Sequence, residues 1–212
     1  MTVEPGPSRV ERKRARRVAE VERVAARLFA TKGYERTNFE DVAAELDLRG
    51  PSLYHYFSSK EELLRRCLRS SSDEVLRRLR AIADREAPAA RVLHALFHEQ
   101  VLIEVRDFPE FAALFLRMPA STPELQEIVL DVRRAHAQIF EQVARRVAAH
   151  TGPPTGPGTV DRDRWRVRLS VVFGALAYVP EWYDPAGPMG PETLADEMAD
   201  TLLTLFGGGG PA

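Results

Sequence analysis

The chain has 212 residues, of which 44% are hydrophobic and 29% are charged, and its formal net charge is −1 at pH 7. This composition supports a packed core and excludes a wholly disordered chain. The sequence lacks both a run of about 18 apolar residues and an apolar segment behind its charged first residues, so it predicts neither a membrane span nor a secretory signal. A single cysteine, Cys67, excludes a disulfide within the chain and fits a reducing cytoplasm.

The residue pattern predicts an all-α protein that begins with a flexible arm, residues 1–8, rich in proline and glycine. Apolar residues then recur at helical spacing in nine segments, and no strand pattern or internal repeat is present. The predicted helices cover residues 10–31, 39–46, 50–57, 60–86, 88–105, 110–118, 123–150, 162–182 and 192–206. The glycine-rich segment 207–212 is predicted to be a disordered tail.

Two short helices joined by a tight turn, residues 37–57, have the build of a helix-turn-helix, whose second helix enters the DNA major groove. Charge favours the same end of the chain, since residues 1–69 hold 15 Lys and Arg against 11 Asp and Glu, whereas residues 70–212 hold 15 against 20. We therefore expect a DNA-binding domain at 9–66, a linking fourth helix at 60–86, and a ligand-binding and dimerisation domain at 67–206.

The second short helix places Leu53 and Phe57 four residues apart, which predicts that both face the core. Its outer face then carries groups that can read base edges or bind phosphates; Arg49, for example, can bind guanine O6 and N7. Two helix N-termini are further candidates for phosphate contacts. The predicted DNA-binding residues are Thr37, Arg49, Gly50, Pro51, Ser52, Tyr54, His55, Tyr56 and Lys60.

The spacing F-x-x-V-A-x-x-L-x-L-x-x-P-S-L-Y-x-Y-F-x-S-K-E-E-L, over Phe39–Leu63, resembles the DNA-binding domain of TetR-type transcriptional regulators. The likeness covers residues 12–66 and implies a homodimer that binds a palindromic operator and releases it when a small molecule binds the C-terminal domain. Two departures stand out. Asp47 replaces a small turn residue, and we expect it to adopt the left-handed backbone. Arg49 replaces a Ser or Thr cap, which predicts a weaker cap.

The C-terminal two thirds hold aromatic residues that are candidates for a pocket between helices, with core packing as the alternative role for each. The predicted pocket residues are Phe97, Phe111, Phe115, Met118, Phe140, Phe173, Tyr178 and Trp182. The helices at 124–150 and 162–182 are the predicted dimerisation pair, because small residues near Gly174 allow close approach.

The stretch from Phe173 to Pro188, followed by Glu192–Asp196, is similar to the end of TetR-type regulators that sense acyl-CoA thioesters of fatty-acid or steroid catabolism. That resemblance implies basic residues for the phosphates of such a ligand. The candidates are Arg106, Arg117, Arg133 and Arg134, with a solvated surface as the alternative role for each.

The sequence bears on three classes of function. An enzyme is disfavoured, since the sequence contains no H-E-x-x-H, P-loop or G-x-S-x-G motif, and the His94/His98 pair lacks a third metal ligand. A helical adaptor without DNA remains an alternative. The favoured reading is a cytoplasmic, dimeric repressor released by a small hydrophobic effector such as an acyl-CoA, with no cofactor, metal, catalytic residue or membrane partner. A regulator of efflux or detoxification genes that senses a drug-like molecule is the alternative within that class.

Overall fold

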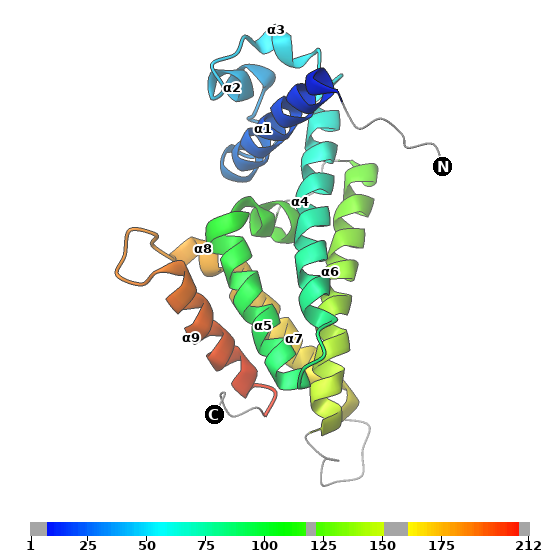
Figure 1. Ribbon diagram of the computed structural model, residues 1–212, viewed down its shortest axis with the longest axis vertical. Helices are drawn as coiled ribbons and strands as arrows, with labels where there is room; N and C mark the ends of the chain where they lie inside the picture. Colours follow the sequence, from blue (N-terminus) through cyan, green and yellow to red (C-terminus); the bar gives the residue numbers. More distant parts are fainter. Residues whose placement is uncertain (1–7, 118–121, 151–160, 208–212) are drawn as a thin grey trace. The chain divides into compact units, whose positions relative to one another are not determined.

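A computed structural model describes residues 8–117, 122–150 and 161–207, and within these ranges the chain is helical with no strand, as predicted (Figure 1). The chain divides into two compact units, Met1–Ser70 and Ser71–Ala212. The helices are α1 (Arg9–Lys32), α2 (Phe39–Ala44), α3 (Gly50–Leu53), α4 (Lys60–Ala83), α5 (Ala89–Leu102), α6 (Pro123–His150), α7 (Asp161–Ala177), α8 (Val179–Trp182) and α9 (Pro191–Thr204), with π-helical segments η1 (Ile103–Asp107) and η2 (Ala112–Arg117). In the described part of the chain, no helix is long and apolar enough to cross a bilayer.

The first unit is built on α1, which begins directly after Ser8, the last residue of the predicted arm. Residues 1–7 of that arm lie outside the described residues. Ser8 caps it reciprocally: its hydroxyl accepts the Glu11 N–H at 3.2 Å, and the Glu11 carboxylate accepts the Ser8 N–H at 2.6 Å. Gly33, at φ 87°, ends the helix in the left-handed half of the backbone map. The inner face of α1 includes Val21 and Phe29, both almost fully buried.

Helices α2 and α3 pack on each other, and α2 packs on α1, which makes a three-helix core (Figure 1). Phe39, Val42 and Leu53 fill it and are at most 4% exposed. Asn38 starts α2 with a capping box, because its side chain accepts the Asp41 N–H at 2.8 Å and the Asp41 carboxylate accepts its N–H at 3.0 Å. The hydrogen bond from the Asn38 N–H to the Asp41 carboxylate, followed by the hydrogen bond from Lys32, lowers the pKa of Asp41.

The turn between α2 and α3 confirms both expectations drawn from its unusual residues. Asp47 has φ 53°, the left-handed conformation that Asp tolerates better than most side chains. Arg49 is the N-cap residue of α3, and its side chain makes no capping hydrogen bond within the described residues. The helix is shorter than the predicted 50–57, since regular α-helix ends at Leu53 and a turn continues to Tyr56.

The start of α4 differs in detail from the predicted capping box. Ser59 accepts the Glu62 N–H at 3.0 Å, as expected, but the Glu62 carboxylate binds the backbone N–H and hydroxyl of Ser58 instead of Ser59. The hydrogen bonds from Ser58 lower the pKa of Glu62. Helix α4 is continuous from Lys60 to Ala83, and the division between the two units falls within it.

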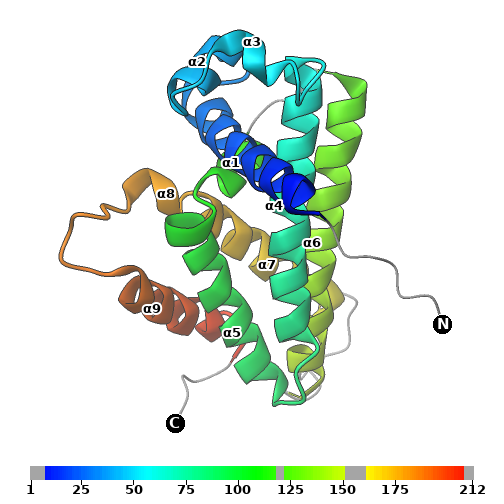
Figure 2. The ribbon, with the colours of Figure 1, turned by 45° about the horizontal axis from the view of Figure 1, so that its top comes forward.

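In the second unit, α5 packs against α9 and α6, and α6 packs against α7 (Figure 2). The α5–α9 contact carries two parallel side-chain pairs on its edge. His94 Nε2 lies 2.9 Å from Asp200 Oδ1, and His98 Nε2 lies 3.3 Å from Asp196 Oδ1. The two histidines considered as a metal pair are thus each joined to an aspartate of α9.

The predicted helix 162–182 is two helices, α7 and α8, separated at Tyr178. Pro180 lies in the first turn of α8. A proline inside a continuous helix would remove one backbone donor and clash with the carbonyl four residues earlier, so the chain turns before it. The predicted helix at 88–105 also changes character, because α5 gives way to the π-helical segment η1 at Ile103.

Candidate nucleic-acid interface and buried cavity

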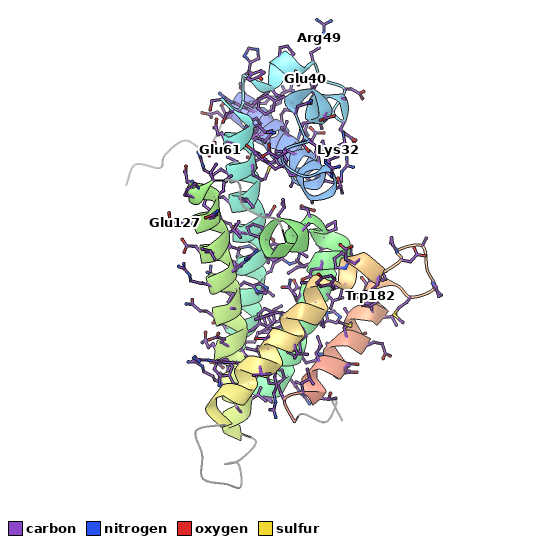
Figure 3. All side chains as sticks on the ribbon, turned by 180° about the vertical axis from the view of Figure 1, so that it is seen from behind. Lys32, Glu40, Arg49, Glu61, Glu127 and Trp182 are labelled. Carbon is purple, nitrogen blue, oxygen red and sulfur yellow. The ribbon has the colours of Figure 1, made fainter. Side chains whose placement is uncertain are left out.

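The short helix α3 is anchored from within and leaves its polar groups outside. Leu53 and Phe57 are at most 1% exposed, as their spacing predicts. Arg49 is exposed and extends away from the helices (Figure 3). Its carbonyl accepts the Ser52 hydroxyl at 2.5 Å, which fixes the Ser52 side chain beside it.

Three other predicted residues contribute to this surface in different ways. Tyr54 is 61% exposed, and its ring packs edge-on against Phe39 with a 4.8 Å centroid distance. His55 is exposed, and Pro51 occupies the first turn of α3, where its missing N–H costs nothing. Gly50 gives room to a neighbour, since a Cβ there would lie 3.1 Å from Glu40 Oε1.

A groove of about 950 Å³ runs between the first half of α1 and the α3 region. Its α3 side is formed by Ser52, His55 and Tyr56. Its α1 side carries a basic cluster, Lys13, Arg14, Arg16 and Arg17, with Glu20 as the acidic neighbour. The remaining lining residues are Val10 and Leu48.

These α1 cations were not among the individually predicted contacts. The signal was the run of basic residues between Arg12 and Arg17, four of which line the groove together with α3. Arg14 lies over the Tyr56 ring at 6.0 Å, and Arg17 pairs with Glu20 at 2.9 Å. A cationic wall beside hydrogen-bonding side chains is the arrangement that neutralises a phosphate backbone and reads bases next to it.

Two predicted phosphate contacts, Thr37 and Lys60, are instead engaged inside the first unit. Thr37 is 1% exposed, and its hydroxyl donates to the Gly33 carbonyl at 2.9 Å. Lys60 Nζ donates to the Tyr34 carbonyl at 2.9 Å and lies 4.3 Å from the centre of the Tyr34 ring. Both therefore hold the α1–α2 connection in place, and we leave them out of the proposed DNA contacts.

The second unit contains a cavity of about 240 Å³. Helices α5 and α6, the segment η1 and helix α7 supply its lining. The lining residues are Gln100, Glu104, Arg133, His136, Ala137, Phe173 and Leu176. The wall is thus apolar on the α7 side and polar where α5, η1 and α6 meet.

A chain of hydrogen bonds forms the polar side of the cavity. Gln100 Nε2 donates to Glu104 Oε1 at 2.6 Å, and His136 Nε2 lies 2.8 Å from Gln100 Oε1. Glu104 and Gln100 are at most 1% exposed, and His136 is 5% exposed. Burial lowers the pKa of His136 to about 4, so its ring is neutral at pH 7.

The aromatic residues predicted to form a pocket divide into two groups. Phe111, Phe140 and Phe173 surround His136 with ring-centre distances of 5.9, 4.9 and 5.5 Å. Phe97 stacks on Phe140, and Phe115 packs on Phe111. Among the predicted aromatic residues that the structure describes, Phe173 alone lines the cavity.

The remaining predicted pocket residues lie elsewhere. Tyr178 and Trp182 are 60% and 57% exposed, and Figure 3 places Trp182 on α8. Met118 falls outside the described residues. The exposed pair is therefore better suited to a surface contact than to an enclosed ligand.

The four arginines predicted to hold ligand phosphates are also dispersed. Arg133 lines the cavity, and its Nε donates to the Phe115 carbonyl. Arg106 is held by Asp107 at 2.7 Å and by Glu192 at 2.6 Å, and Arg134 pairs with Asp131 at 2.9 Å. The side chain of Arg117 lies outside the described part.

Metal binding has little support in the described ranges, where no group of three or more His, Cys, Asp or Glu side chains could hold an ion. His94 and His98 are instead paired with α9, as described above. The buried Cys67 thiol lies 3.2 Å from the Glu22 carbonyl.

Comparison with known proteins assigns both units. Residues 23–67 match the family model described as bacterial regulatory proteins of the tetR family, and residues 86–206 match the Tetracyclin repressor-like C-terminal domain. The transcriptional repressor KstR2 of Mycolicibacterium smegmatis is 31% identical over 205 residues, covering 89% of this chain and 90% of that protein. KstR2 of Mycobacterium tuberculosis is 37% identical over 81 residues, so that match spans 38% of this chain and 40% of that protein.

The fold has a counterpart among solved structures. The structure of AibR in complex with isovaleryl coenzyme A and operator DNA superposes with a TM-score of 0.72 at 22% identity, covering 88% of this chain and 98% of that one. At this identity the likeness concerns the fold. With both of its units matched and a relative aligned along nearly its whole length, the chain belongs to the TetR family of bacterial regulatory proteins.

Proposed function

We propose that this protein is a transcriptional repressor that binds operator DNA through the groove between α1 and α3. The observation that carries the proposal is the groove itself, in which four cations of α1 face the hydrogen-bonding groups of α3. Cations neutralise the phosphates of a DNA backbone, and hydrogen-bonding groups recognise base edges. The family membership and the repressors among its relatives support the same conclusion.

The roles within the groove follow from reach and chemistry. Arg49 and Ser52 are placed to contact base edges, because Arg49 extends outward and Ser52 lies beside it. Tyr54, His55 and Tyr56, together with the α1 cations, suit phosphate oxygens.

We further propose that two copies of the chain associate through α7, with α6 as its neighbour. Val167 and Val171 of α7 and Tyr178, the residue directly after it, are each more than half exposed and form an apolar stripe. Gly174 lies on the same face, and a Cβ there would meet no atom of the described residues within 4 Å. Such a flat apolar stripe is suited to the matching helix of a second copy. Two DNA-reading units would then bind half-sites of a palindrome about 34–36 Å apart.

The cavity in the second unit is the proposed effector site. It is lined by four helical segments, so a bound molecule can bias their packing, and α4 carries residues of both units in one continuous helix. An effector that binds one arrangement of the dimer more tightly than the other would shift the dimer toward that arrangement. The resulting change in operator affinity is limited by the difference between the effector's affinities for the two arrangements. An acyl-CoA, the effector that the sequence resemblance implies, could place its acyl part in this cavity.

A DNA titration tests the proposal. A duplex selected from a random pool by the wild-type protein is titrated at several salt concentrations. The double variant Arg16→Ala/Arg17→Ala is expected to weaken binding to all sequences and to reduce the slope of log K against log salt by about 2. Arg49→Ala is expected to relax discrimination between selected and mismatched duplexes, because a good base contact discriminates by about 1–3 kcal/mol.

Arg91→Ala, an exposed arginine of α5, is the matched control and should behave as wild type. Failure of the pool to yield any duplex bound in a salt-dependent way would refute the proposal and favour the helical adaptor. Unchanged slopes in the double variant would refute the assignment of the groove.

A further inference from the structure

The polar side of the cavity has a fixed direction of hydrogen bonding. The amide nitrogen of Gln100 faces Glu104 and donates to its Oε1 at 2.6 Å. The amide oxygen of Gln100 then faces His136 Nε2 and can only accept. His136 Nε2 must therefore carry the ring proton, as inferred from this network.

That tautomer leaves His136 Nδ1 with a lone pair. The ring is neutral, since burial holds the pKa of His136 at about 4. Among the described residues nothing donates a hydrogen bond to Nδ1, although the side chain is 5% exposed and lines the cavity. An acceptor on the cavity wall is satisfied when a bound molecule supplies the donor.

The size and charge of the cavity limit what that molecule can be. A volume of about 240 Å³ equals about eight waters of liquid volume, which corresponds to an organic body of about eight to ten heavy atoms. One carboxylate and one guanidinium, Glu104 and Arg133, line it, so their formal charges balance. Phe173, Leu176 and Ala137 make the remaining wall apolar. A small, uncharged and largely apolar body fits this lining.

We propose that the cavity binds a small uncharged hydroxyl compound whose O–H donates to His136 Nδ1. The inference rests on the proposed effector site and names the chemical class of its ligand. It separates this chain from a sensor that recognises only the acyl part of a thioester, because a thioester carbonyl accepts hydrogen bonds and cannot satisfy a second acceptor.

Two probes of nearly equal shape test the class. 4-Methylphenol and p-xylene (1,4-dimethylbenzene) each have eight heavy atoms, and the first carries a hydroxyl where the second carries a methyl group. Binding of each to the full-length protein is measured by titration calorimetry or by ligand-observed NMR. The wild-type protein is expected to bind 4-methylphenol at least tenfold more tightly than p-xylene.

Two variants locate the effect. His136→Phe keeps an aromatic ring among Phe111, Phe140 and Phe173 but removes the acceptor. The affinity of this variant for 4-methylphenol should therefore fall to its affinity for p-xylene. Ala137→Leu fills the cavity without touching the hydrogen-bond chain and should weaken both probes. Far-UV circular dichroism checks that each variant is folded. The ratio of the two affinities in the wild-type protein is a test that does not depend on any variant.

Equal affinity of wild type for the two probes, or no binding of either, would overturn the proposal. So would undiminished discrimination in His136→Phe, full binding in Ala137→Leu, or binding of isovaleryl-CoA that excludes 4-methylphenol and is indifferent to His136→Phe. Operator release is scored separately. If 4-methylphenol binds as expected and the DNA affinity does not change, the ligand class stands and the control of DNA binding by this cavity fails.

Discussion

The neutral state of His136 should make the stability of the second unit depend on pH in a way that His136→Phe removes. In the unfolded chain the imidazole has a pKa of about 6.5, whereas burial lowers its pKa to about 4 in the folded protein. Below pH 6.5 the unfolded state therefore binds the proton that the folded state excludes. The stabilising contribution is complete above pH 6.5 and is lost as pH falls from 6.5 toward 4.

The size of this loss follows from the two pKa values. Relative to pH 7.5, wild type should lose about 2 kcal/mol of unfolding free energy at pH 5 and about 3 kcal/mol at pH 4 from this one group. His136→Phe lacks the titrating group but keeps Glu104, Arg133 and the other ionisable side chains. The difference between the two proteins at each pH therefore isolates His136.

Urea unfolding followed by tryptophan fluorescence provides the measurement. Both tryptophans, Trp165 and Trp182, lie in the second unit, so their emission reports on the unit that contains His136. His136→Phe will already differ from wild type in unfolding free energy at pH 7.5, because Gln100 loses its hydrogen-bond donor. This offset does not depend on pH. A difference that stays constant within about 0.5 kcal/mol between pH 7.5 and pH 5 would refute the assignment of a buried neutral histidine.

Three further predictions concern the first unit and the proposed α7 interface. Lys60→Met should lower the unfolding free energy by about 1–2 kcal/mol through loss of its bonds to Tyr34, with DNA affinity retained; weaker DNA binding at unchanged stability would return Lys60 to the phosphate contacts. Asp47→Gly should raise the melting temperature, since it relieves a left-handed backbone worth up to about 1 kcal/mol, and a lower value would show that the aspartate side chain is needed. Val171→Arg should yield a monomer by light scattering at micromolar concentration, and an intact dimer would exclude the α7 face.

The helical spacing of apolar residues was sufficient to predict the all-α architecture, because each long helix buries one stripe of apolar side chains. The predicted helix at 123–150 agrees with α6 at both ends, where Pro123 begins it. Periodicity failed where the backbone departs from the regular repeat. It did not register that Pro180 separates α7 from α8, and it has no signal for the π-helical turns η1 and η2.

For the DNA-reading unit, residue type predicted the surface better than it predicted individual contacts. Arg49, Ser52 and His55 lie on the outer side of α3, as expected from the inward spacing of Leu53 and Phe57. Lys60 has the charge and position of a phosphate ligand, yet the carbonyl and ring of Tyr34 lie within its reach. A long flexible side chain can satisfy either partner, and only the coordinates distinguish them.

Phe173 and Arg133 of the cavity wall were predicted from the sequence, whereas its polar residues Gln100, Glu104 and His136 were not, because only aromatic and basic residues were considered for the pocket. The sequence nevertheless carries a signal for these three. Gln100 and Glu104 continue the inner stripe of α5 at helical spacing from Phe97, and His136 continues that of α6 four residues after Val132. Polar groups at such core positions each carry a desolvation penalty that an apolar residue would avoid.

Mutual hydrogen bonding offsets part of that penalty but supplies no reason for it, because an apolar core of the same shape is as stable as a satisfied polar network or more so. The chain of bonds also ends in an acceptor that the described residues leave to the cavity, at His136 Nδ1. Stability alone would select against that arrangement. A chain of hydrogen bonds that ends in an acceptor facing a cavity is what recognition of a polar group on a small molecule requires, and this acceptor, more than the presence of a cavity, is the argument for an effector site between α5, α6 and α7.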